Sequence, residues 1–231
     1  MLILSLPEAD IPVTLIRRPR QSIGIRVRGG RVELVAHPAV PLATLQAVLE
    51  KRRDWIRLHW LEQQQRRAEL SAQPLQLHLA GLPLDIAHVA GQRPAARLNG
   101  QVLQVAGVAE HERERLDAIV AAWLKREAAR RFPARLAEVV RGSRRQPASL
   151  SLSSARTRWG SCSASGAIRL NWRLVQAPPH ILDYVLAHEL AHLVHMNHSA
   201  AFWSETERLF PDWRPARQWL KQHGDTLFAF G

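Results

Sequence analysis

The stretch from Pro178 to Leu193 constrains the fold more than any other part of the chain, because its pattern fits one kind of helix. Two prolines open it, and proline is favoured in the first turn of a helix. At roughly 100° per residue, His188 and His192 lie about 40° apart on one face. The opposite face is apolar and carries Leu182, Leu186, Leu190 and Leu193. The pattern therefore predicts a helix that is anchored in a core by leucines and presents two imidazoles one turn apart.

Two histidines four residues apart on a helix suit a metal ion. Side chains at this spacing lie ~6 Å apart, so both rings can reach one Zn²⁺ at ~2.1 Å. Glu189 is rotated about 100° from His188, so it is poorly placed as a ligand but can take a proton from a metal-bound water. We therefore expect a zinc site at His188 and His192 with Glu189 as the general base. The alternative is a buried helix with two incidental histidines.

Three residues compete to be the third metal ligand. His195 shares the helix face, but a straight helix would place it in line with the first two histidines, and a tetrahedral metal needs a ligand from off that axis. Glu205 is expected on the next helix, with only a short connection back. His198 follows Asn197, and asparagine tolerates the left-handed conformation that ends helices. We therefore expect His198 to be the third ligand.

Several segments together match a known family. They are Arg156, RWGSC at 158–162, IRLNWRLV at 168–175, Asp183-Tyr184-Val185, HELAH at 188–192, Asn197-His198-Ser199, Phe202-Trp203 and, near the start, IGIRVRGGRVELVAHP and KRRDWI. Over roughly residues 13–224 the chain resembles the YgjP-like metallopeptidase family of predicted metal-dependent hydrolases and, more distantly, the SprT-like zinc proteases.

The resemblance implies a zincin-type catalytic fold, one zinc ion and peptide-bond hydrolysis. It also points to His198 as a ligand, through the NHSxxFW segment. In zincin-like proteins an edge strand beside the metal helix aligns the substrate as an added strand, and the region from RWGSC to LNW is the candidate here.

Three residues are candidates for substrate binding. Arg158 can stabilise a substrate carboxylate or an oxyanion, with an ion pair to Asp183 or Glu205 as the structural alternative. Trp159 lies beside a Gly-Ser pair and can line a groove. Tyr184 falls about 40° from His188 on the same helix face, where it can donate to an oxyanion or simply pack.

The rest of the chain alternates between strand and helix signals. Strand-like segments are expected at 11–36, with a hairpin turn at Gly29-Gly30, at 75–106, with a hairpin at Asn99-Gly100, and at 148–175, with a turn at Ser165-Gly166. Helical segments are expected at about 41–70, ended by Pro74, at 109–141, broken or kinked at Pro133, and from Pro178 onward. We find no internal repeat in the sequence.

These segments predict an α+β fold in two parts. Residues 1–107 would form a strand-rich subdomain with a bracing helix at about 41–70. Residues 108–231 would form a zincin-like catalytic subdomain, with the metal helix against a small antiparallel sheet.

The positive charge is unevenly distributed along the chain. The net charge is +12, and residues 1–150 carry +10 of it, away from the metal motif. Such a basic surface is either simply solvated or gives weak nucleic-acid binding.

Cys162 is the single cysteine, so no internal disulfide is possible; it is a candidate soft ligand or a small buried residue. No apolar run approaches the ~20 residues of a membrane span, so we expect a cytoplasmic protein.

The sequence therefore predicts a zinc-dependent hydrolase, with a metallopeptidase acting on peptides or proteins as the leading interpretation. Its mechanism would use a zinc-activated water with Glu189 as the base. Two alternatives are a metal-dependent amide hydrolase acting on a small molecule and a nucleic-acid- or ribosome-associated protein with a zinc site.

Overall fold

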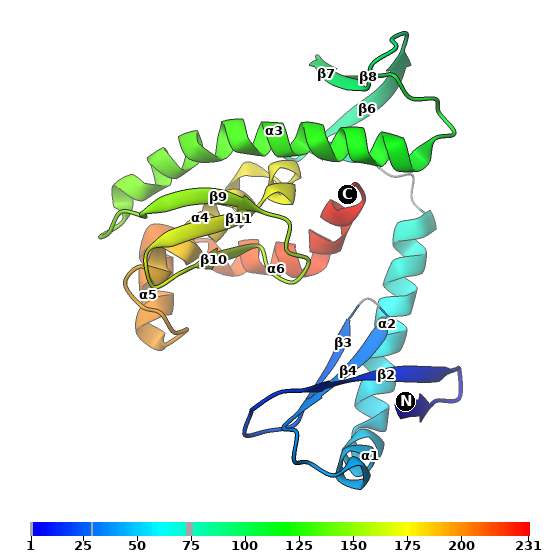
Figure 1. Ribbon diagram of the computed structural model, residues 1–231. Helices are drawn as coiled ribbons and strands as arrows, with labels where there is room; N and C mark the ends of the chain where they lie inside the picture. The colour runs from blue at the N-terminus through cyan, green and yellow to red at the C-terminus, as the bar shows by residue number, and fades with distance from the viewer. Residues whose placement is uncertain (1, 29, 73–75) are drawn as a thin grey trace. The chain divides into compact units, whose positions relative to one another are not determined.

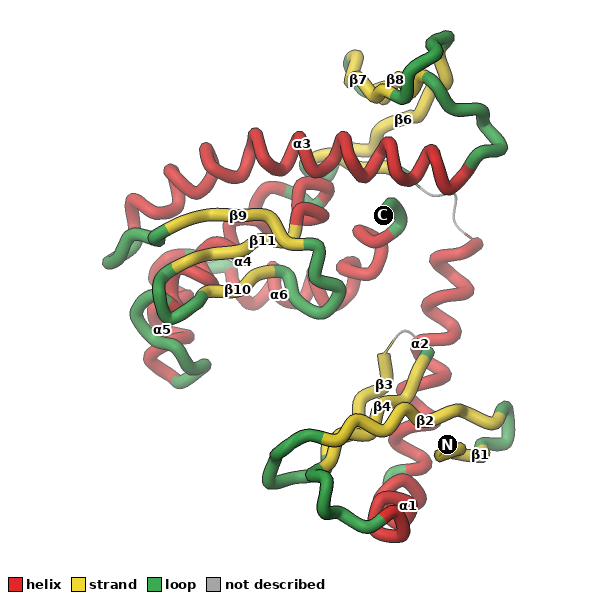
Figure 2. The backbone as a smooth tube through the Cα atoms, viewed as in Figure 1, coloured by secondary structure: helices red, strands yellow, loops and turns green. Residues whose placement is uncertain are grey.

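The computed structural model describes residues 2–28, 30–72 and 76–231, and the chain divides into two compact units, Met1–Pro74 and Leu75–Gly231. Both units combine strands and helices, as expected for an α+β protein (Figures 1 and 2). The boundary lies at residue 74, whereas the sequence analysis placed it at residue 107. The reason is that Leu77, Leu84 and Leu103 pack into the same core as the helices of the second unit.

The first unit is a four-stranded sheet with two helices. Its elements are β1 (Leu2–Ser5), β2 (Asp10–Arg17), β3 (Gly24–Arg28), β4 (Arg31–Ala36), α1 (Leu42–Lys51) and α2 (Arg53–Ala72). The strand order is β1-β2-β4-β3, with β2 and β4 parallel and the other neighbours antiparallel. Strands β3 and β4 pair on either side of the predicted hairpin turn. Gly29 of that turn, and Pro74, which was predicted to end the helical segment, lie outside the described residues.

The second unit begins with a sheet of the same topology. Its strands are β5 (Leu77–Leu79), β6 (Leu82–Val89), β7 (Ala95–Asn99) and β8 (Val102–Ala106), in the order β5-β6-β8-β7. Strands β6 and β8 are parallel and the other neighbours antiparallel, so the strand arrangement of the first unit is repeated although the sequence shows no repeat. The hairpin predicted at Asn99-Gly100 is confirmed.

A long helix and a second sheet follow. Helix α3 (Arg113–Val139) continues through Pro133, so of the predicted break or kink the break is absent. A short 3-10 turn, η1 (Val140–Gly142), follows it. The sheet contains β9 (Ser149–Ser153), β10 (Gly160–Cys162) and β11 (Ala167–Asn171), and α3 packs beside β9 (Figure 1). The predicted turn at Ser165-Gly166 is confirmed, since it joins β10 and β11.

This sheet is mixed, which corrects the prediction of an antiparallel one. Strand order is β10-β11-β9; β10 is antiparallel to β11, but β11 is parallel to β9. The chain passes from β9 to the outer strand β10 before it returns to the centre, which gives β9 and β11 the same direction. Strand β10 is therefore left at an edge of the sheet.

The remaining elements are helical. They are the 3-10 turn η2 (Trp172–Gln176), α4 (Pro179–His192), α5 (Ala200–Leu209), α6 (Trp213–His223) and the 3-10 turn η3 (Gly224–Phe228). The strand predicted to extend to residue 175 ends at Asn171, because the Asn171 side chain accepts a hydrogen bond from the Arg173 amide and starts the 3-10 turn. Helix α4 packs against β10, α5 and α6, which places it at the centre of the candidate site.

Candidate functional site

Helix α4 is held rigidly by its apolar face. Leu182, Leu186 and Leu190 are buried in the core of the second unit, as the periodicity predicted. The helix begins at Pro179, the second of the two prolines, and ends at His192. A rigid helix fixes the positions of His188 and His192, whose ring centres lie 5.0 Å apart.

A turn after α4 brings a third histidine to the first two. The Nε2 atoms of His188 and His198 are 3.2 Å apart, and one nitrogen from each of His188, His192 and His198 lies within 4.8 Å of the others. Ser199 begins α5 by accepting a hydrogen bond from the Phe202 amide, so the residue after His198 is anchored by the next helix.

The turn itself differs from the one predicted. Among the residues that the structure describes, Ala80 is the one non-glycine residue with a positive φ, so Asn197 does not adopt the left-handed conformation. Instead, the last turn of α4 tightens: the amides of Leu193 and Val194 bond to carbonyls three residues earlier. The helix ends at His192, although the amide of His195 still bonds to the carbonyl of Ala191, four residues earlier.

The three imidazoles fit a tetrahedral zinc ion. Zn–N bonds of ~2.1 Å in a tetrahedron place the ligand nitrogens about 3.4 Å apart, close to the 3.2 Å between His188 and His198. The Nδ1 atom of His192 lies 3.1 Å from the carbonyl oxygen of His195, which accepts its proton and leaves Nε2 as the lone-pair donor. A metal ion held by these three nitrogens would keep a fourth coordination position, since the described residues bring no further ligand into the cluster.

Burial favours the neutral form of the His188 and His192 rings. It lowers the pKa of His188 to about 3, with smaller contributions from the nearby His192, His198 and Arg217. Burial also lowers the pKa of His192, against the hydrogen bond to the His195 carbonyl. A neutral imidazole has the free lone pair that a metal ligand needs.

Glu189 lies beside the three histidines in a tight, buried position. Its side chain is 3% exposed, and burial raises the pKa of its carboxyl group to about 8, against the positive charge of Arg158. Gly160 in β10 is in direct contact with it, since a Cβ built at Gly160 would lie 2.3 Å from Oε1 of Glu189. The carboxylate is therefore confined between α4 and β10.

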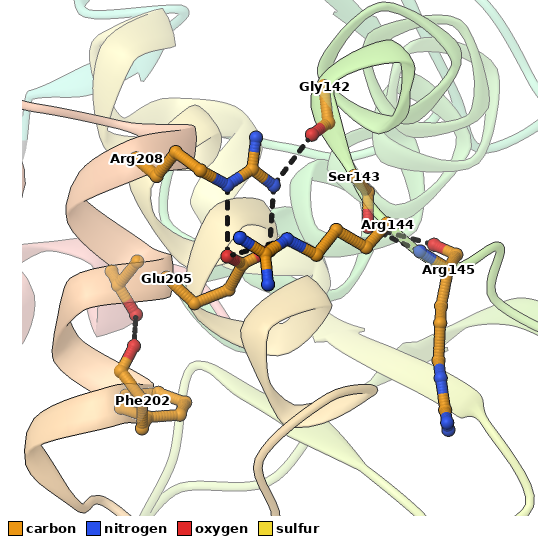
Figure 3. Close-up of polar contacts among 8 residues, drawn as sticks. Gly142, Ser143, Arg144, Arg145, Phe202, Glu205 and Arg208 are labelled. Atoms are coloured by element: carbon orange, nitrogen blue, oxygen red, sulfur yellow. Dashed lines mark hydrogen bonds and ion pairs between the residues drawn. The ribbon is translucent and has the colours of Figure 1, made fainter.

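The other candidate ligands do not join the cluster. Glu205 is buried and ion-paired with Arg208, whose Nη2 lies 2.7 Å from its Oε1, and Arg144 approaches it from the loop after α3 (Figure 3). Arg208 also donates to the carbonyl of Gly142, so Glu205 belongs to a contact between α5 and the end of α3 (Figure 3). The Cys162 thiol, whose pKa is raised by burial and by Glu189, lines the pocket described next and lies outside the histidine cluster.

A pocket of about 620 Å³ opens over the three histidines and Glu189. It is also lined by Arg158, Trp159, Gly160, Ser161, Cys162, Tyr184, Val185, Met196, Arg217, Leu220 and Lys221. The three residues predicted to bind substrate, Arg158, Trp159 and Tyr184, are thus all in its wall.

The ion pair considered for Arg158 does not form with either predicted partner. Asp183 is ion-paired with Arg135 of α3 through both of its carboxylate oxygens, and Glu205 with Arg208, so neither takes the ion pair considered for Arg158. The Tyr184 side chain is 6% exposed and still reaches the pocket.

Helix α6 also contributes to the pocket, which was not predicted from the sequence. Arg217, Leu220 and Lys221 follow the three- and four-residue spacing of one helix face, and this pattern was the available signal. The spacing of these residues along the sequence does not show that this face of α6 lies beside the histidines.

No helix in the described part of the chain is both long enough and apolar enough to span a membrane.

Comparison with known proteins adds two findings. A family model described as YgjP-like, metallopeptidase domain, matches residues 21–223. Among solved structures, the crystal structure of the metallopeptidase zymogen of Pyrococcus abyssi abylysin is 25% identical in sequence, with a TM-score of 0.37, and the match covers 42% of this chain and 95% of that chain. The comparison with curated proteins gave no match.

Proposed function

The chain belongs to the YgjP-like metallopeptidase family, and from this premise we propose that it is a zinc-dependent metallopeptidase. His188, His192 and His198 would hold the metal, and Glu189 would be the general base. The observation that carries the proposal is the convergence of three histidine nitrogens within 4.8 Å, in a pocket that also contains the buried Glu189 carboxylate.

A bound zinc ion would supply a Lewis acid that polarises a carbonyl and acidifies water. Glu189 accepts a proton from the attacking water at its carboxylate and returns it to the nitrogen of the leaving amine. Its confinement against Gly160 fixes the carboxylate in position for both transfers. Tyr184 and Arg158 line the pocket and would donate hydrogen bonds to the oxygen that becomes negative during attack.

The edge strand β10 supports a peptide as the substrate. Its residues Gly160–Cys162 pair with β11 on one side, and Gly160, Ser161 and Cys162 line the pocket. An extended peptide can add to such an edge through main-chain hydrogen bonds, which would lay its scissile bond across the histidine cluster. A small-molecule amide has no extended main chain that could pair with this strand.

The donor set favours an enzyme over a protein with a structural zinc. Closed structural sites use four protein ligands, and the described residues bring three together. A buried carboxylate beside an open coordination position has a chemical role in hydrolysis and none in a structural site.

Digestion of casein and of a peptide library tests the proposal, with the Glu189→Gln variant as the matched control. We expect the zinc-loaded wild-type protein to cleave and a chelator to abolish cleavage. Glu189→Gln should keep its metal and lose ~10²-fold or more in rate, because the general base is removed. Retention of more than about a tenth of the wild-type rate would show that Glu189 is misassigned. Hydrolysis of small amides without any cleavage of peptides would favour the alternative enzyme.

A further inference from the structure

The pocket over the histidines has a strongly cationic wall. Arg217 and Lys221 lie one turn apart on α6, and Arg158 enters from the segment before β10. Among the described residues that line this pocket, Glu189 is the one acidic residue, and it is buried at the floor. A pocket lined in this way attracts negative charge.

Arg217 is the best placed of these cations. Its guanidinium carbon lies 5.2 Å from the centre of the Trp203 ring, a favourable contact between a cation and an aromatic face. Trp203 in turn stacks on His198 at 5.7 Å and on Trp213 at 4.4 Å. The stack positions the guanidinium beside the proposed metal ligands without occupying its hydrogen-bond donors.

The charge of Arg217 reaches into the pocket. Arg217, Tyr184 and His188 all line this pocket. Tyr184 lies on α4 one turn before His188, and their ring centres are 6.0 Å apart. Arg217 therefore acts on the part of the pocket in which the reacting bond would lie.

Two acidic residues close to the proposed metal ligands in sequence are engaged with other cations. Asp183 pairs with Arg135, and Glu205 with Arg208. In the part of the chain that the structure describes, no carboxylate forms an ion pair with Arg158 or with Arg217. The guanidinium groups of Arg158 and Arg217 can thus pair with a ligand carboxylate.

We propose that this wall is a carboxylate-binding subsite and that Arg217 is its main recognition residue, so that the substrate is a peptide with a carboxylate close to the scissile bond. The inference rests on the proposed function and narrows its substrate class. A guanidinium can hold a carboxylate through two parallel hydrogen bonds, which gives geometric selection as well as charge. The carboxylate belongs either to an acidic side chain or to the C-terminus of the peptide.

Matched peptides distinguish these two sources. One pair differs by Glu or Gln at each position flanking the cleaved bond, and a second pair ends in a free carboxylate or an amide. We expect one charged member to be cleaved with a kcat/KM about tenfold above that of its neutral partner, the size expected for a hydrogen-bonded charge in a partly enclosed pocket. Equal rates within both pairs would overturn the proposal.

Variants at Arg217 test the assignment, with Arg214→Gln as the matched control on the same helix, since Arg214 pairs with Glu207 and does not line the pocket. Arg217→Gln should reduce the preference to below about twofold, and Arg217→Lys should keep part of it, because it retains the charge but not the paired donors. Arg214→Gln should leave the preference intact. A full preference in a metal-loaded Arg217→Gln protein, or its loss in Arg214→Gln, would refute the role of Arg217.

Binding to the Glu189→Gln variant separates this inference from the proposed function. Calorimetric titration with the same peptides reports carboxylate recognition without turnover. If the wild-type protein cleaves no peptide, the proposed function fails, yet tighter binding of the charged peptides would still support the subsite. If peptides are cleaved but charged and neutral ones bind equally, the subsite fails and the peptidase stands.

Discussion

Replacement of Gly160 by alanine should disable Glu189 without touching a metal ligand. A Cβ at this position would lie 2.3 Å from Oε1 of Glu189 and 2.7 Å from its Cδ and Cγ, whereas ordinary contacts begin at 3.4 Å. The carboxylate would have to move by roughly 1 Å, and a misplacement of that size can cost ~10² in rate. Glu189 is 3% exposed, so the movement also strains its surroundings, at about 1–3 kcal/mol.

The assay is peptide hydrolysis together with the metal content of the purified variant. We expect Gly160→Ala to lose about 100-fold in kcat/KM and to keep one metal ion per chain, because the histidines come from other positions. Gly142→Ala is the matched control, since its added Cβ would meet Leu209 at 3.5 Å, an ordinary contact. A Gly160→Ala protein with more than about a third of the wild-type rate would refute the reasoning.

Three further predictions concern the third histidine, the buried Glu205 and the basic part of the chain. The His198→Ala variant should lose most of its zinc. The His195→Ala variant should retain its zinc, because it keeps the backbone carbonyl that orients His192. Metal analysis that shows the reverse would contradict the ligand assignment. Glu205→Gln should cost about 1–2 kcal/mol of unfolding free energy at pH 7 by urea titration. The Arg208 side chain lowers the pKa of Glu205, so this stabilisation is present above the ordinary carboxyl pKa and is lost as pH falls through the lowered value; a wild-type–variant difference that persists at pH ~2.5 would contradict it. The basic excess in residues 1–150 should give weak polyanion binding, and an absence of DNA or RNA binding at ~50 mM salt would dismiss it.

The centre of the site was predictable because its signal is local. The four-residue spacing of His188 and His192 and the leucines opposite them define both faces of α4, and the structure places the helix accordingly. The convergence of His198 on the pair agrees with the expected position, although the expected cause, a left-handed Asn197, is absent. The spacing of apolar residues predicts which face of a helix is buried. The conformation of the turn after the helix depends on how the next helix packs.

The features that were missed depend on contacts between distant segments. The direction of β9 relative to β11 is set by how the chain passes through β10, and no property of either strand encodes it. Similarly, Arg217 lies on a helix face that the sequence reveals, but its approach to the histidines follows from the packing of α6 on α4. The boundary at residue 74 follows from the packing of β5–β8 against the core of the second unit, which strand signals alone do not show.

X-ray absorption at the zinc edge of the protein loaded with one equivalent of metal tests the central claim most directly. A site made by His188, His192 and His198 should give three imidazole nitrogens at ~2.0–2.1 Å and one further light atom that the protein does not supply. Two results would contradict this claim. One is a sulfur at ~2.3 Å, which the single cysteine, Cys162, could provide, and the other is a fourth protein ligand that closes the site.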